Sequence, residues 1–113
     1  MLFEFSIDLE KELDRLLGGY QIIIPQAVAE ELGVLSQKGR GKQKRNAITA
    51  LIMIQKYEVV DVGNGSTADD VIVSAADDFS ATVVTNDIGL RQRLKKNNHS
   101  VVFLRGKNHL ALD

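Results

Sequence analysis

The sequence contains no cysteine, which excludes disulfide bonds, thiolate nucleophiles and cysteine-based zinc sites. It also has no uninterrupted apolar run of about 18 residues, the length that a membrane-spanning helix needs. The N-terminal stretch "MLFEFSIDLEKEL" lacks a basic segment followed by an apolar one, as a secretory signal has. These absences predict neither export nor membrane spanning, and they favour a cytoplasmic location.

The length of 113 residues, 44% of them hydrophobic, is enough for one buried core but short for two. We therefore expect residues 1–113 to form a single domain. No internal repeat or low-complexity segment interrupts the chain.

The net charge of −1 hides an uneven distribution of charged residues. Five of the 14 basic residues lie in "SQKGRGKQKR", residues 36–45, and six more lie between Arg91 and Lys107. Neither segment contains an acidic residue. Charge runs are often only solvated faces, but two acid-free basic segments beside clustered acids favour a polyanionic partner.

Apolar spacing and turn residues predict helices alternating with strands. Ser6 is expected to cap the first helix, in which Leu9, Leu13, Leu16 and Leu17 follow helical spacing up to Gly18. Residues 36–45 are expected to form a glycine-broken loop or the start of a helix. Further helices are predicted at 25–35, 46–57, 67–79 and 88–98, and strands at 20–24, 58–62, 81–85 and 100–104.

Strands that read as continuous apolar runs, alternating with helices, predict an α/β fold. We expect a three-layer α/β/α sandwich with a central, mainly parallel sheet. Sites in such folds lie beyond the carboxyl ends of the strands, so acidic residues close behind those ends are candidate functional residues.

Three acidic residues lie behind strand ends. On the helix from Pro25, Glu31 stands about 60° from apolar Val28, whereas Glu30 points away. On the helix 67–79, Asp69 borders an expected inward face of Ile72, Ala75, Ala76 and Phe79, and Asp70 is turned roughly 160° from Ile72. Asp87 directly follows the strand 81–85. Glu31, Asp69 and Asp87 are therefore expected to converge at one edge of the sheet.

Converging carboxylates repel one another unless a cation lies among them, and an oxygen-only site suits Mg²⁺ or Mn²⁺. Such a site positions water for attack on phosphate. Each acid also has an ordinary structural interpretation. Asp87 or Asn86 is a suitable helix N-cap, Asp69 and Asp70 are favourable first-turn charges, and Glu31 is a plausible surface residue.

Several stretches resemble the PIN-domain ribonucleases. "IIIPQAVAEELGVL" is similar to a strand followed by P-x-x-V-x-x-E-L, and "ADDVIVSAA" is similar to the family's A-D-x-x-I-x-x-A helix. "ATVVTND" with the following "LRQRL" resembles the family's next strand and helix. Asp69 and Asp87 lie 18 residues apart, as expected in the family. The resemblance covers residues 3–113. The ending "VVFLRGKNHLAL" looks most like the archaeal branch related to ribosomal-RNA processing factors, and a toxin–antitoxin ribonuclease stays open.

The resemblance implies a divalent-metal-dependent RNA endonuclease. Asp69 and Asp87 would be metal ligands and, with Glu31 holding water or a second ion, the catalytic residues. The supporting residues would be Thr85, Asn86 and Asp70, with hydrogen bonds from Thr85 and Asn86 orienting the site. The RNA backbone would contact basic side chains, which add affinity rather than sequence choice. These are Lys42, Lys44, Arg45, Arg91 and Arg93.

The family opens with a central strand ending in D-x-N, and this sequence starts with what normally follows that motif. Glu4 and Asp8 do not match the motif's aspartate. We therefore expect the first strand to be missing and the metal site to be incomplete. Unpaired strand edges would then favour a homodimer or an N-terminal rearrangement.

Two other classes of function stay open. One is a non-catalytic RNA-binding or ribosome-assembly module, which would keep salt-dependent RNA binding without cleavage. The other is a phosphatase or response-regulator-like domain with a phosphorylated aspartate, although the acid after the first strand and the lysine that this chemistry needs are not found. Expected partners are RNA, a second copy of the chain, and an antitoxin or ribosome-assembly protein.

Overall fold

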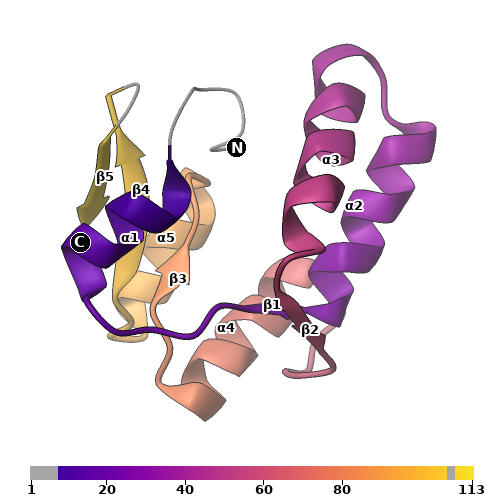
Figure 1. Ribbon diagram of the computed structural model, residues 1–113. Helices are drawn as coiled ribbons and strands as arrows, with labels where there is room; N and C mark the ends of the chain where they lie inside the picture. Colours follow the sequence, from indigo (N-terminus) through magenta and orange to yellow (C-terminus); the bar gives the residue numbers. More distant parts are fainter. Residues whose placement is uncertain (1–7, 107–108) are drawn as a thin grey trace. The chain divides into compact units, whose positions relative to one another are not determined.

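The computed structural model describes residues 8–106 and 109–113, and it divides into two compact units (Figure 1). One unit consists of Met1–Gln21 together with Ala76–Asp113, and we call it the discontinuous unit. The other, Ile22–Ala75, is the continuous unit. The predicted cap Ser6 lies outside the described residues. The prediction of one domain over 1–113 stays a prediction.

The continuous unit contains two parallel strands, β1 (Ile23–Pro25) and β2 (Glu58–Val60). Ile24 pairs with Val59 in the centre of this short ladder. Pro25 was expected to be the first residue of a helix. It instead ends β1 in an extended conformation, with φ −60° and ψ 137°, and occupies the N-cap position of the helix that follows. The rigid proline ring thus fixes the turn from strand to helix.

Two helices form a hairpin in the same unit, α2 (Gln26–Lys38) and α3 (Gly41–Ile54) (Figure 1). Only Gly39 and Arg40 separate them, so the basic segment 36–45 is mostly helical. Of the two structures expected for the basic segment, the start of a helix is the one found, since α3 begins at Gly41, and lysine, glutamine and arginine are good helix formers. The hairpin buries Leu32, Ala47, Ala50 and Ile54.

The discontinuous unit holds a three-stranded sheet of order β3–β4–β5 (Val83–Val84, Val101–Arg105 and His109–Leu112). β3 and β4 are parallel, as expected, and α5 (Ile88–Lys96) connects them. β5 runs antiparallel to β4 and was not predicted. A further helix, α4 (Ala68–Phe79), contains the division between the units, which falls after Ala75.

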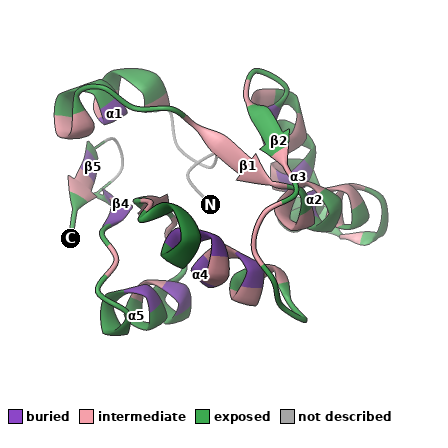
Figure 2. Cartoon of the chain, turned by 90° about the horizontal axis from the view of Figure 1, so that it is seen from below, coloured by how far each residue is buried: buried purple, intermediate pink, exposed green. Residues whose placement is uncertain are grey.

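The α/β class with parallel strand pairs is confirmed, but the described strands form two sheets rather than the single central sheet that was expected. Figure 2 colours buried residues purple, and they occur on α4, α5 and β4. In the discontinuous unit six hydrophobic side chains are at most 2% exposed, namely Leu13, Ala76, Leu94, Val101, Val102 and Leu110.

α1 (Leu9–Leu17) is the predicted first helix, with Leu13 buried. Asp8 caps it by accepting a hydrogen bond from the backbone N–H of Lys11. Gly18 ends it at φ +73°, a left-handed conformation that glycine adopts without steric cost.

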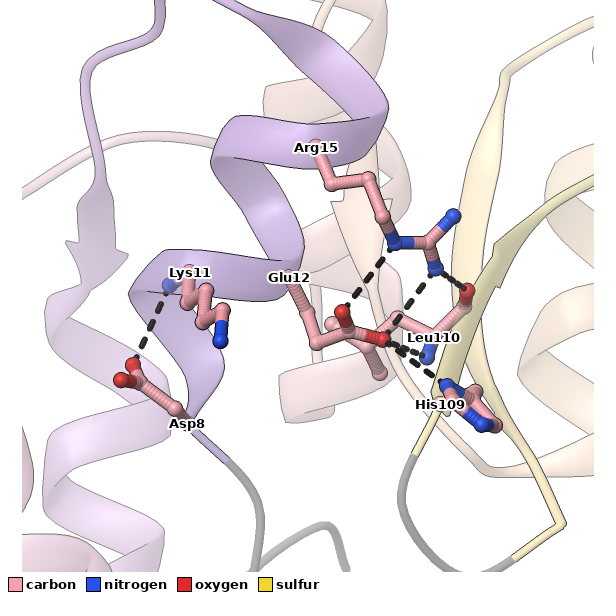
Figure 3. A network of polar contacts seen from close by, with 6 residues as sticks. All are labelled: Asp8, Lys11, Glu12, Arg15, His109 and Leu110. Atoms are coloured by element: carbon pink, nitrogen blue, oxygen red, sulfur yellow. Dashed lines mark hydrogen bonds and ion pairs between the residues drawn. The ribbon is translucent and has the colours of Figure 1, made fainter.

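Side chains of α1 close the outer edge of β5 (Figure 3). Val101 and Asp113 exchange backbone hydrogen bonds, and the alternation along an antiparallel ladder therefore turns Leu110 away from β4. The N–H of Leu110 donates to Glu12 Oε1 at 2.9 Å, and its carbonyl accepts from Arg15 Nη2 at 2.8 Å. Arg15 also pairs with Glu12 at 3.1 Å. Glu12 and Arg15 thus make the hydrogen bonds to Leu110 that a neighbouring strand would otherwise make.

We predict that Glu12→Gln lowers the stability of the fold at neutral pH. The hydrogen bond from Arg15, followed by that from Leu110, lowers the pKa of the Glu12 carboxyl from 4.5 to about 2. This stabilisation is fully present above pH 4.5 and is lost as the pH falls towards 2. Urea midpoints measured between pH 7 and pH 2 should therefore fall less steeply with acid in the variant.

Asp78→Asn, which changes an exposed carboxylate on α4, is the matched control and should keep the wild-type pH profile. Equal stability of Glu12→Gln and wild type at pH 7 would show that the β5 edge does not need this carboxylate.

Candidate active site

The turn from β3 into α5 carries Thr85, Asn86 and Asp87. The Asp87 carboxylate caps α5, because its Oδ1 accepts a hydrogen bond from the backbone N–H of Leu90 at 2.8 Å. The backbone N–H of Asp87 in turn donates to Thr85 Oγ1 at 3.2 Å. The residue is exposed, and the cap uses one of its two carboxylate oxygens. Capping by Asp87 therefore leaves Oδ2 available for a ligand.

Asn86 fixes this turn to the sheet. Its Oδ1 accepts a hydrogen bond from the backbone N–H of Leu104, in β4, at 3.0 Å. Thr85 contributes at the backbone, where its N–H donates to the carbonyl of Val102. These hydrogen bonds hold the Asp87 backbone in place, and the supporting roles of Thr85 and Asn86 at a metal site stay predictions.

The first turn of α4 carries Asp69 and Asp70. Thr67 caps this helix, since its Oγ1 accepts from the backbone N–H of Asp70 at 3.1 Å. Asp69 is exposed and lies one turn before buried Val73, while Asp70 is partly buried. The expectation that Phe79 faces inward was wrong, because its side chain is 54% exposed. The buried residues of α4 are Val71, Val73, Ala75 and Ala76.

A glycine loop holds the start of α4 in place. Gly63 has φ +77°, and a Cβ there would overlap the carbonyl oxygen of Val71. The backbone N–H of Asn64 donates to Ser74 Oγ at 3.0 Å. Sequence reasoning found the turn but did not assign Thr67 or Ser74. The T-x-x-D spacing of residues 67–70, a helix-capping signature, could have revealed Thr67.

Glu31 lies on α2 and is exposed. Its neighbour Glu30 accepts a hydrogen bond from Gln26 Nε2 at 3.1 Å, one helical turn earlier. Glu31 and Asp69 belong to the continuous unit, and Asp87 belongs to the discontinuous one. The convergence of the three carboxylates stays a prediction.

The donor set suits a hard divalent cation, because all three side chains supply anionic oxygen and are exposed. Within residues 8–106 and 109–113, no group of three or more aspartate, glutamate or histidine side chains has the arrangement of a metal site. The three carboxylates therefore suit a divalent cation in the chemistry of their oxygen atoms and in their exposure to solvent.

The predicted RNA-binding cations differ in their surroundings. Lys42, Lys44 and Arg45 are exposed on the first turns of α3. Arg93 is exposed on α5, but the Arg91 side chain is only 27% exposed. Its guanidinium stacks 3.7 Å from the ring centroid of Phe103 and pairs with Asp113 at 3.5 Å. Arg91 therefore has a clear structural role within its unit.

The sequence of this chain matches a known family. A family model described as a PIN-like domain matches residues 1–107, and the chain belongs to this family. It is 31% identical to Ribonuclease VapC4 of Methanocaldococcus jannaschii over 115 residues, which cover 98% of the chain and 87% of that protein. It is also 31% identical to Ribonuclease VapC9 of Archaeoglobus fulgidus over 91 residues, which cover 80% of the chain and 66% of that protein.

None of the helices in the described part of the chain has the length and apolar character needed to cross a membrane.

We predict that Asp87→Ala destabilises the protein by about 1 kcal/mol, the usual cost of losing an N-cap side chain, whereas Asp87→Asn changes stability by only a few tenths. Asparagine retains an oxygen that can accept from the Leu90 N–H. Urea unfolding of both variants measures the difference. If the two variants lose equal stability, the hydrogen bond from Leu90 is not what holds this turn.

Proposed function

We propose that this chain is an RNA endonuclease of the toxin type that requires Mg²⁺ or Mn²⁺. The observation that carries the proposal is its similarity to a ribonuclease along 98% of its length. An accessible aspartate at the carboxyl end of β3, in a turn fixed by Asn86, supports the same activity.

Asp69 and Asp87 would hold the cation, and Glu31 would hold water or a second ion. A divalent cation held there supplies positive charge beside the scissile phosphate and activates water. The protein's part is to keep the carboxylates in place before the ion binds. The Leu90 N–H fixes Oδ1 of Asp87, and the Thr67 cap and the Gly63 loop fix the helix turn that bears Asp69.

The RNA backbone would bind cations on α3 and α5, chiefly Lys44, Arg45 and Arg93, with a further contribution from Lys42. Exposed cations attract phosphates and release their counterions, which makes binding dependent on salt. Arg91 would contribute less to RNA binding than the sequence suggested, because its guanidinium is stacked on Phe103 and paired with Asp113.

Two features of the proposal concern substrate and partners. The similarity to the VapC ribonucleases favours an antitoxin partner. The alternative, a ribosomal-RNA target with a ribosome-assembly partner, rests on the resemblance of residues 101–112 to processing factors. A homodimer would cover strand edges, since β1 and β3 each pair on one side only among the described residues.

We predict that Asp87→Asn abolishes Mn²⁺-stimulated cleavage while the fold stays intact. Loss of one anionic oxygen from a hard-cation site should reduce cleavage of a labelled RNA by roughly 100-fold or more, the scale on which removal of one preorganised charge contact acts. Calorimetry with Mn²⁺ on the same variant should show weaker binding of the ion.

The adjacent pair on α2 gives a matched comparison, because Glu31→Gln should impair cleavage and Glu30→Gln should not. Salt-dependent RNA binding by the wild-type chain without cleavage at any Mn²⁺ concentration would contradict the proposed activity. That outcome would identify a non-catalytic RNA-binding module.

We also predict that Lys44→Ala/Arg45→Ala weakens RNA binding and flattens its salt dependence. Two lost phosphate contacts should reduce the slope of log K against log salt by about 1.4 for single-stranded RNA. Mn²⁺ binding should be unchanged. RNA titrations at several salt concentrations measure the slope, and a parallel shift without a change in slope would show that these cations do not contact phosphate.

A further inference from the structure

Two cations of α5 share one carboxylate, which comes from the residue after β5. Arg91 and Lys95 lie one turn apart on the same face of the helix, and we call them the α5 clamp. Asp113 contacts both, with its Oδ2 at 3.5 Å from Arg91 Nη2 and its Oδ1 at 3.6 Å from Lys95 Nζ. All three residues belong to the discontinuous unit, so their arrangement is fixed within that unit.

The backbone holds Asp113 beside the clamp. Asp113 and Val101 exchange backbone hydrogen bonds at 2.8 and 3.3 Å. Residues directly opposite each other share a face of the sheet, and so do residues two apart along a strand, so Asp113 lies on the face that carries Phe103. The Arg91 guanidinium is stacked on the ring of Phe103. The carboxylate is therefore presented to the clamp at a high effective concentration.

Asp113 does not fully satisfy the clamp. Charge-assisted N–H···O bonds are usually about 2.7–2.9 Å long, and the carboxylate makes no bond of that length with either cation. Within the described residues, Arg91 Nε is a buried side-chain nitrogen without a hydrogen-bond partner. Residues 88–112 carry six basic residues and no acidic one, so positive charge remains in excess on this side of the unit. The clamp thus suits a ligand with more charge and more oxygens than a carboxylate has.

Among the groups of an RNA molecule, a terminal phosphate meets this requirement best. A phosphomonoester carries about 1.5 to 2 negative charges at pH 7 and three acceptor oxygens, which suit pairing with arginine. A phosphodiester inside the RNA chain carries a single negative charge, as the carboxylate of Asp113 does. Because Asp113 is already tethered at the site, an internal phosphate gains little by displacing it, whereas a terminal phosphate gains a further ionic contact.

We propose that the α5 clamp binds a terminal phosphate of RNA and that Asp113 excludes internal phosphates from it. Asp113 is then a specificity residue that makes the chain distinguish phosphorylated RNA ends from the rest of the RNA backbone. The choice of RNA as the ligand rests on the proposed function. Free inorganic phosphate shares the same chemistry, but it lacks the additional backbone contacts that RNA makes with exposed cations such as Arg93.

The test uses the full chain without divalent metal, so that RNA is bound and not cleaved. One internally labelled RNA is prepared in three forms, with a 5′-phosphate, with a 3′-phosphate, and with hydroxyl groups at both ends. In anisotropy titrations at low salt, the wild type should bind at least one phosphorylated form about fivefold more tightly than the hydroxyl form, the size expected of one further ion pair. Inorganic phosphate should remove this preference only at concentrations far above that of the RNA.

Asp113→Asn opens the clamp to internal phosphates. This variant should bind the hydroxyl RNA about fivefold more tightly than the wild type does, with a steeper dependence on salt and a smaller preference for the phosphorylated form. Asp78→Asn is the matched control, because it removes the same charge from an exposed position on α4 and should bind all three RNAs as the wild type does.

A second pair of variants assigns the clamp itself. Lys95→Gln and Lys96→Gln each remove one positive charge from adjacent exposed positions on α5, but Lys96 is turned about 100° from Lys95 around the helix. Lys95→Gln should lose the preference for the terminal phosphate, and Lys96→Gln should keep it. Circular dichroism and melting temperature establish that the variants are folded.

Equal binding of the three RNAs by the wild type, unchanged binding in Asp113→Asn, or equal preferences in Lys95→Gln and Lys96→Gln overturns the proposal. Loss of the preference at inorganic phosphate concentrations similar to that of the RNA also overturns it, because free phosphate would then be the ligand. A chain that shows the preference but cleaves no RNA with Mn²⁺ contradicts the nuclease activity and leaves the clamp standing. Cleavage of RNA without the preference contradicts the clamp alone.

Discussion

The sheet of the discontinuous unit depends on hydrogen-bond partners for the backbone groups on the side of β5 that faces away from β4. Leu110 directs both its N–H and its carbonyl away from β4, and a backbone pair left without partners in a partly buried position is costly. Glu12 and Arg15 satisfy both groups and also bind each other. Because the pair belongs to α1, the same contacts fix the helix against the sheet, and the edge is closed to another strand.

The corner between β3 and α5 shows how one carboxylate serves structure and remains available for chemistry. A helix cap and a metal ligand are usually treated as competing interpretations of an aspartate, but a carboxylate has two oxygens. In Asp87 the N–H of Leu90 takes Oδ1, and the orientation of Oδ2 is thereby restricted. Asn86, anchored on Leu104, prevents the turn from moving away from the sheet. The hydrogen bonds that stabilise this corner therefore also hold a candidate catalytic residue in a fixed orientation.

Much of the local structure could be predicted because it depends on local patterns. The spacing of Leu9, Leu13 and Leu17 predicts α1, and Leu90 and Leu94 predict α5. The apolar runs around Ile24 and Val83 predict strands that pair in parallel with later ones. The strand-end position of Asp87 follows from the same patterns, and so does its suitability as a cap.

The rest depends on interactions between residues far apart in the sequence. Glu12 and Leu110 are 98 residues apart, and nothing local in "HLAL" indicates that a helix near the start of the chain would stabilise it as β5. The stacking of Arg91 on Phe103 is another contact that charge patterning does not reveal, since the sequence presents Arg91 and Arg93 as equivalent cations. In α3, glycine at 41 suggested a break, but the following residues favour helix strongly enough to begin it there.

The order of the units along the chain has a consequence for biosynthesis. The continuous unit is one uninterrupted segment whose main helical contact, between α2 and α3, joins neighbours in sequence. Such contacts close short loops, and this unit can fold while the remainder of the chain is still being made. The discontinuous unit joins α1 to strands near the other end of the sequence. Glu12 and Arg15 of α1 can therefore bind the backbone of Leu110 only after β5 has been synthesised. During synthesis, the hairpin of α2 and α3 can therefore form before the sheet of the discontinuous unit.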